Sequence, residues 1–86
     1  MSRLLEKLER LISLYDFYGP LLTKRQKQAI ELYYETDLSL SEVAQQMAIT
    51  RQGVYDLLKR TERSLEDYES RLRLAAKFQE DRKSQA

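Results

Sequence analysis

Residues 40–59, LSEVAQQMAITRQGVYDLLK, carry the pattern that decides the fold. Ala44 is a small residue at the position where two short helices would cross at a steep angle. Ala48 occupies the turn, where glycine is often used because the residue adopts a positive φ. Thr50 is a good N-cap for the following helix. This stretch predicts a helix-turn-helix whose core residues around Ala44 are Val43, Met47, Ile49, Val54 and Leu57.

The start of the first helix in this motif has its own local signals. Ser39 and Glu42 have capping-box spacing, and Leu38 with Val43 forms a hydrophobic staple. The first helix therefore runs from Leu40 to about Met47. A plain helical hairpin is the alternative, but two capped starts only eleven residues apart favour the helix-turn-helix.

Helical periodicity also precedes the motif. A helix is predicted over residues 2–17 and ends at Gly19-Pro20, because proline cannot continue a helix. A second helix begins after Thr23, which has capping-box spacing with Gln26, and stops near Glu35. The expected inner stripe of the first of these helices is Leu4, Leu8, Leu11, Tyr15 and Tyr18, widened by Leu5 and Ile12.

The helix that starts at Thr50 is predicted to be long. Apart from Gly53 no breaker follows, so one unbroken helix to about Gln79 is expected, a rod of about 40 Å. We expect an all-α single domain over residues 1–79 and a frayed polar tail over 80–86. The apolar stripe of the long helix is Val54, Leu58, Thr61, Leu65, Tyr68, Leu72 and Ala75.

Composition restricts the class of protein. The chain has 86 residues, 42% of them hydrophobic, with two glycines and one proline, which favours one helical domain. The net charge is +1, so any contact with nucleic acid requires local clustering of cations. The chain has no cysteine, no apolar signal-peptide core and no apolar run long enough to span a membrane. We expect a cytoplasmic protein without a membrane partner.

The residues of an active site are also missing from the sequence. The chain has no histidine and no cysteine, and its carboxylates are scattered among lysines and arginines. No glycine-rich phosphate loop or metal-ligand spacing occurs. We expect no catalysis, no cofactor and no metal.

Three stretches of the chain resemble a known family. Residues 22–34, 38–44 and 49–55 are similar to sigma-factor region 4 and, more closely, to the small YlxM family of Gram-positive bacteria. The resemblance covers residues 12–73 and includes the sequences FY at 17–18, ELYY at 31–34 and VYD at 54–56. It implies a sigma region 4-like helix-turn-helix between an N-terminal helix and a long C-terminal helix. It also implies a regulatory or accessory protein of the signal recognition particle pathway, with particle components as partners.

If the motif binds nucleic acid, the helix after Thr50 enters the major groove with its first turns against the bases. Arg51 would pair with guanine and Gln52 with adenine, whereas Lys59 and Arg60 would meet phosphates. DNA and RNA are equally credible, although A-form RNA would be held through phosphates and shape. The expected nucleic-acid-binding residues are Thr50, Arg51, Gln52, Tyr55, Asp56, Lys59 and Arg60, with Ser39 and Ser41 at the preceding helix start and the basic cluster Lys24, Arg25 and Lys27.

The alternative for each of these residues is an ordinary solvated helix surface. The negative charge of Asp56 is unfavourable beside a phosphate, although a carboxylate can accept a hydrogen bond from cytosine. Five aromatic residues suggest a stacking platform for single-stranded bases, but their helical spacing favours packing in the core. They are Tyr15, Phe17, Tyr18, Tyr33 and Tyr34.

The outer helices suggest a different role. The N-terminal helix and the long fourth helix are expected to pack as a parallel or antiparallel pair. The fourth helix would be longer, about 40 Å against about 24 Å, leaving its end uncovered. Leu72, Ala75 and Phe78 would then need a partner, which predicts a homodimer. The alternative function is therefore a helical protein-interaction or dimerisation module that does not read DNA.

Overall fold

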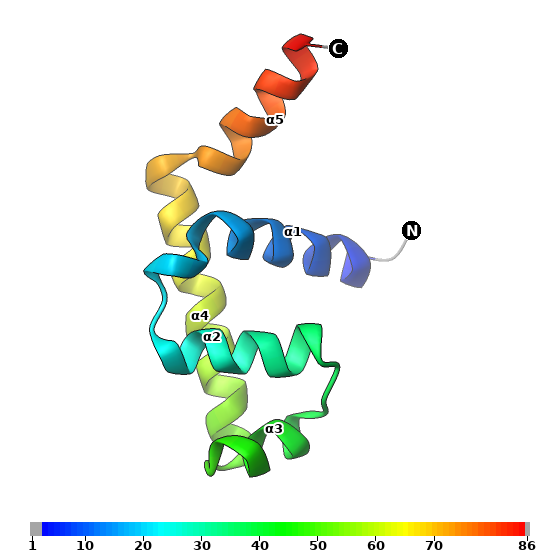
Figure 1. Cartoon of the computed structure of the whole chain (residues 1–86), viewed down its shortest axis with the longest axis vertical. Helices are drawn as coiled ribbons and strands as arrows, with labels where there is room; N and C mark the ends of the chain where they lie inside the picture. The colour runs from blue at the N-terminus through cyan, green and yellow to red at the C-terminus, as the bar shows by residue number, and fades with distance from the viewer. Residues whose placement is uncertain (1–2, 86) are drawn as a thin grey trace.

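The computed structural model describes residues 3–85, and every regular element in that part of the chain is helical. The all-α fold class is confirmed. In chain order the elements are α1 (Arg3–Tyr18), the 3-10 turn η1 (Gly19–Leu21), α2 (Lys24–Ile30), the π-helical turn η2 (Glu31–Glu35), α3 (Leu40–Met47), α4 (Arg51–Leu72) and α5 (Leu74–Gln85). α4 forms the spine of the molecule, with α1 and α2 lying across it and α3 beside its beginning (Figure 1).

The local signals in the sequence begin the helices where they were predicted. Thr23 and Ser39 both form complete capping boxes, at the starts of α2 and α3. Thr50 caps α4, its Oγ1 accepting a hydrogen bond of 2.9 Å from the backbone N–H of Gly53. Ala48 has φ 56°, the left-handed conformation expected at the turn. The helix-turn-helix prediction is confirmed.

The core lies where α1, α2 and α3 meet one side of α4. Val43 and Val54 are fully buried at the crossing of α3 and α4, and Ala44 lies beside them. On α1 the predicted stripe faces the core, since Leu11 and Tyr18 are buried, but it is widened by the buried Leu14 and not by Leu5 and Ile12, which are exposed. The predicted widening of that stripe was therefore wrong. The side chain of Leu4 lies outside the described residues.

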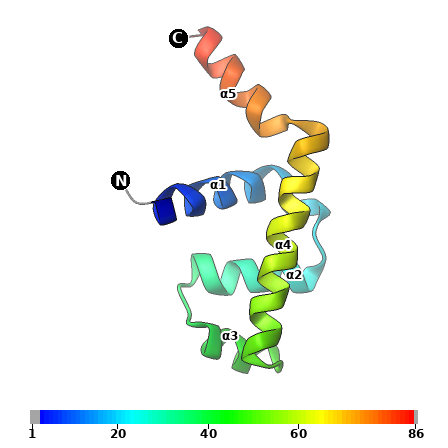
Figure 2. The same cartoon turned by 180° about the vertical axis from the view of Figure 1, so that it is seen from behind.

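α4 does not run unbroken to Gln79 as predicted. It ends at Leu72, and Arg73 takes the left-handed conformation with φ 54°, after which α5 begins in a new direction (Figures 1 and 2). Side chains of α1 and α4 stabilise the break between α4 and α5. The hydroxyl of Tyr18, at the end of α1, accepts a hydrogen bond from the N–H of Leu74. The Glu69 carboxylate accepts from the next two N–H groups of α5. These contacts satisfy backbone donors that an unbroken helix would satisfy internally.

α1 crosses α4 instead of lying along it, so the predicted parallel or antiparallel pairing was also wrong (Figures 1 and 2). Two ion pairs join the helices at the crossing. Arg10 forms a two-pronged pair with Glu66, both N···O distances being 2.7 Å, and Lys7 lies 3.6 Å from Glu62. Heptad-like spacing indicated which residues face a partner helix, but it carried no information on the crossing angle.

Residues 80–85, expected as a frayed tail, continue α5 as helix, and Ala86 lies outside the described residues. None of the helices between residues 3 and 85 is both long and apolar enough to cross a membrane.

Candidate nucleic-acid interface

The crossing of α3 and α4 leaves the first turns of α4 open to solvent. Val43 and Val54 anchor the two helices, and the N–H of Ile49 donates to the carbonyl of Ala44 across the turn. Arg51 is exposed at the resulting corner of the molecule. The geometry thus presents the leading end of α4, as insertion into a groove requires.

The residues predicted to read bases lie on this exposed end, where two of them interact with each other. Gln52 Nε2 donates a 3.0 Å hydrogen bond to Asp56 Oδ1, one helical turn away. This bond uses one of the two N–H donors of the Gln52 amide and orients the amide toward Asp56. Arg51 has no such constraint from a described ion pair, so it is the better placed of the two for a base.

The cations expected at phosphates follow on the next turn. Lys59 Nζ lies 5.6 Å from the centroid of the Tyr55 ring, a cation–π geometry. Tyr55 is 46% exposed. Arg60 is exposed on the outer surface of α4. These side chains therefore extend the polar face of α4 beyond its first two turns.

The start of α3 is less favourable to a phosphate than the sequence indicated. Ser39 Oγ accepts a hydrogen bond from Glu42 N–H, and the Glu42 carboxylate accepts one from Ser39 N–H at 3.0 Å. The hydrogen bond from the Ser39 backbone, and after it one from the Ser39 side chain, lower the pKa of the Glu42 carboxyl group. Ser41 is exposed on the same turn. A phosphate there would meet the negative charge of Glu42.

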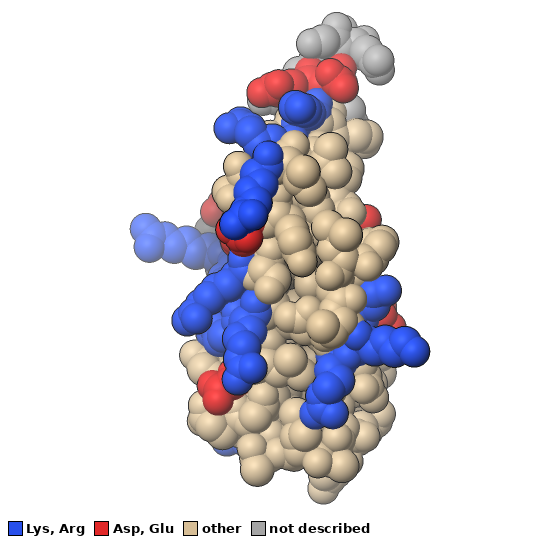
Figure 3. All heavy atoms as spheres, turned by 90° about the vertical axis from the view of Figure 1, so that its left-hand side faces the viewer, with Lys and Arg blue, Asp and Glu red and all other residues tan. Residues whose placement is uncertain are grey.

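The start of α2 differs in charge. Its capping box uses the neutral pair Thr23 and Gln26, with no carboxylate in the first turn. Lys24 and Arg25 are exposed, and Lys27 is partly buried. Figure 3 shows lysine and arginine side chains on both sides of an uncharged strip on one face of the molecule, with fewer acidic groups among them. The cations on this face can therefore attract a polyanion despite the small net charge.

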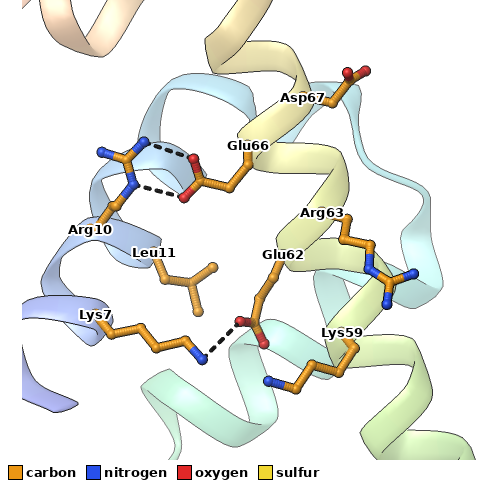
Figure 4. A pocket seen from close by; sticks show the side chains of 8 residues that line it. All are labelled: Lys7, Arg10, Leu11, Lys59, Glu62, Arg63, Glu66 and Asp67. Atoms are coloured by element: carbon orange, nitrogen blue, oxygen red, sulfur yellow. Dashed lines mark hydrogen bonds and ion pairs between the residues drawn. The ribbon is translucent and has the colours of Figure 1, made fainter. Parts of the chain in front are cut away.

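A hollow between α1 and α4 adds three cations that the site prediction did not include, Lys7, Arg10 and Arg63 (Figure 4). We call it the charged hollow; its volume is about 550 Å³, and it is lined by Lys7, Arg10, Leu11, Lys59, Glu62, Arg63, Glu66 and Asp67. The three carboxylates pair with Lys7, Arg10 and Arg71 respectively. Among the described side chains, no carboxylate lies within ion-pair distance of Lys59 or Arg63.

Arg63 is thus a candidate contact that sequence reasoning missed, and Lys7 lines the same hollow while paired with Glu62. The spacing of Lys59 and Arg63, four residues apart, could have shown that they share a helix face. Lys7 could not have been found in this way, because its position depends on how α1 crosses α4.

Comparison with known proteins agrees with this geometry. Residues 5–85 match a family described as "Putative helix-turn-helix protein, YlxM / p13 like". The chain belongs to this family. The match includes both helices of the motif and the bend into α5, so the resemblance seen in residues 12–73 extends over nearly the whole chain.

Two relatives that carry the family's other designation, UPF0122, show how similar the sequences are. The UPF0122 protein of Limosilactobacillus reuteri (strain DSM 20016) is 55% identical over 75 residues, which cover 87% of this chain and 66% of the relative. That of Bacillus thuringiensis (strain Al Hakam) is 52% identical over 77 residues, covering 90% of this chain and 70% of the relative. This chain thus spans about two thirds of the length of the Limosilactobacillus relative.

Proposed function

We propose that this protein is a non-enzymatic regulator that binds nucleic acid through the leading turns of α4. One observation carries the proposal: Arg51, Gln52 and Tyr55 are exposed at the free end of α4, while the buried crossing of α3 and α4 holds that end rigidly. Lys59 and Arg60 supply the phosphate contacts on the following turn, and Lys24 with Arg25 supply a second group. Family membership supports this use of the motif.

The pathway in which the protein acts is part of the same proposal. The resemblance to the YlxM family favours a regulatory or accessory role in the signal recognition particle pathway. The nucleic acid would then be the RNA of the particle or DNA that controls its components. Particle proteins are further candidate partners.

The test is the affinity for duplex DNA and duplex RNA, measured by fluorescence anisotropy between about 50 and about 200 mM salt. The double change Arg51→Ala and Lys59→Ala should weaken binding and reduce the salt slope by about one, because Lys59 is the phosphate contact of the two and Arg51 is placed for a base. Circular dichroism should stay unchanged, since both residues lie outside the core. An unchanged affinity would remove this face of α4 from consideration.

A second candidate function, a dimerisation or protein-interaction module, is favoured by apolar side chains near the bend. Leu72, Leu74 and Phe78 are 45%, 42% and 50% exposed. The Phe78 ring packs edge-on against Phe17 of α1, with centroids 5.7 Å apart, so α1 and α5 share this surface. We propose that it forms a homodimer contact. Binding of a particle protein that survives the double change on α4 would favour this role over nucleic-acid binding.

A further inference from the structure

A second hollow adjoins the charged hollow and differs from it in chemistry. We call it the aromatic hollow; its volume is about 690 Å³, and Tyr33, Tyr34 and Tyr55 are among the residues that line it. The Tyr33 and Tyr34 rings meet edge to face, with centroids 4.9 Å apart. Leu38 and Leu40 add apolar surface. Its lining therefore suits a flat, uncharged ring.

The two hollows form one continuous depression. Lys7, Leu11, Lys59 and Glu62 line both of them. Lys59 lines both hollows, and its Nζ lies 5.6 Å from the centroid of the Tyr55 ring. Arg63 lies one turn further along α4 and lines the charged hollow (Figure 4). A ligand that fills both parts must combine a planar apolar group with an anion.

We infer that this depression binds an unpaired nucleotide of an RNA loop, with the base in the aromatic hollow and its phosphate at Lys59 and Arg63. The inference rests on the proposed function, because Tyr55 and Lys59 belong to the proposed nucleic-acid face. Any base can stack on a tyrosine ring, because every base has a flat aromatic face, and cations beside the ring bind the phosphate backbone of the nucleic acid. A loop is favoured over an RNA helix, because the A-form major groove is too narrow for α4 to enter.

The carboxylates that face the aromatic hollow restrict which base fits. Glu62 pairs with Lys7, and Glu42 accepts from the Ser39 backbone. Asp37 also lines the hollow and is exposed. Its carboxylate can accept a hydrogen bond from an exocyclic amino group, which adenine, cytosine and guanine carry and uracil lacks. Adenine is one base with this group and serves as the probe.

The test compares two RNAs with the same stem, one closed by a loop of adenines and one fully paired. The whole protein should bind the looped RNA more tightly. Tyr33→Leu, which removes a ring of the aromatic hollow at a residue outside the proposed duplex-binding face, should lower affinity for the looped RNA about tenfold and leave the paired RNA within twofold. A 2-aminopurine placed in the loop should be quenched by the unaltered protein but not by this variant.

A second pair of variants tests the phosphate position. Lys59→Gln with Arg63→Gln should reduce the salt slope for the looped RNA by about two. Lys77→Gln is the matched control, because Lys77 is an exposed lysine of α5 that lines neither hollow, and it should leave the slope unchanged.

The outcomes separate this inference from the proposed function. Equal affinity for the two RNAs, or an equal effect of Tyr33→Leu on both, would overturn the nucleotide site while the proposed function stands. Absence of binding to either RNA and to duplex DNA would refute both.

Discussion

The hydroxyl of Tyr18 is the residue-scale feature on which the bend depends. Tyr18 is fully buried, donates a hydrogen bond to Glu69 and accepts one from Leu74 N–H. Tyr18→Phe removes both bonds without changing the shape of the ring. It should lower the free energy of unfolding by about 1–3 kcal/mol, because buried polar groups are left unsatisfied. Urea denaturation measures this, and Tyr55→Phe, at an exposed ring, should change stability by much less.

The carboxyl group of Glu69 predicts how stability depends on pH. Burial opposes its ionisation, but hydrogen bonds from Tyr18, Ala75 and Ala76 outweigh burial and lower its pKa. A carboxyl whose pKa is lower in the folded state stabilises the protein above its unfolded pKa of about 4.3. This contribution is lost as the pH falls through the folded pKa.

The free energy of unfolding should therefore fall as the pH is lowered from 5 toward 3. Glu69→Gln should flatten this dependence, measured by urea denaturation at each pH. Some slope should remain, since hydrogen bonds also lower the pKa values of Glu42 and Glu66. An identical pH profile in the variant would contradict the capping role of Glu69.

At the scale of elements, the break between α4 and α5 can be tested by whether one substitution raises or lowers the stability of the protein. Arg73 has φ 54°, which costs a non-glycine residue about 1–2 kcal/mol. Arg73→Gly should therefore stabilise the protein by about 1 kcal/mol, whereas glycine inside a continuous helix would destabilise it by a similar amount. Arg71→Gly, within α4, is the control and should be destabilising in the same thermal unfolding measurement.

The cap of α4 supports a second prediction at this scale. Thr50→Ala removes the acceptor for Gly53 N–H and should cost about 1 kcal/mol of stability. Thr36→Ala, an exposed threonine that caps no helix start, serves as the control and should change stability little. Equal effects of the two substitutions in urea denaturation would show that the Thr50 cap contributes nothing.

The elements that were predictable from sequence are those with local signals. Thr23, Ser39 and Thr50 each act within three residues, so spacing alone located the starts of α2, α3 and α4. The break at Arg73 has no glycine or proline to announce it. It depends on Tyr18, a residue far away in sequence, and no periodicity carries that information.

The residues of the candidate site also differ in whether the sequence could predict their role. Arg51 and Lys59 were predictable because the motif determines which face of α4 is open. The bond between Gln52 and Asp56 joins residues one turn apart, and its formation is a matter of side-chain geometry. The charged hollow required knowledge of how α1 crosses α4, which spacing does not give.

At the scale of the whole molecule, the exposed apolar surface around the bend predicts self-association. Leu74→Ser with Phe78→Ser should shift the protein from dimer to monomer in sedimentation equilibrium, because the substitutions remove apolar area from the proposed contact. Leu21→Ser, at a leucine of η1 that is 53% exposed, is the control and should leave the mass unchanged. A monomeric unaltered protein at high concentration would refute the dimer.

The start of α5 is capped by side chains of α1 and α4, and this has a consequence for the order in which the chain folds. Its first N–H groups are satisfied by Tyr18 and Glu69, which come together only after α1 has docked on α4. The cap of α5 therefore forms only when α1 is packed on α4. A synthetic peptide of residues 74–85 lacks this cap and should be mostly coil in water. α5 would therefore acquire its helical shape only after α1 and α4 have packed together, and its helicity would report that this packing has formed.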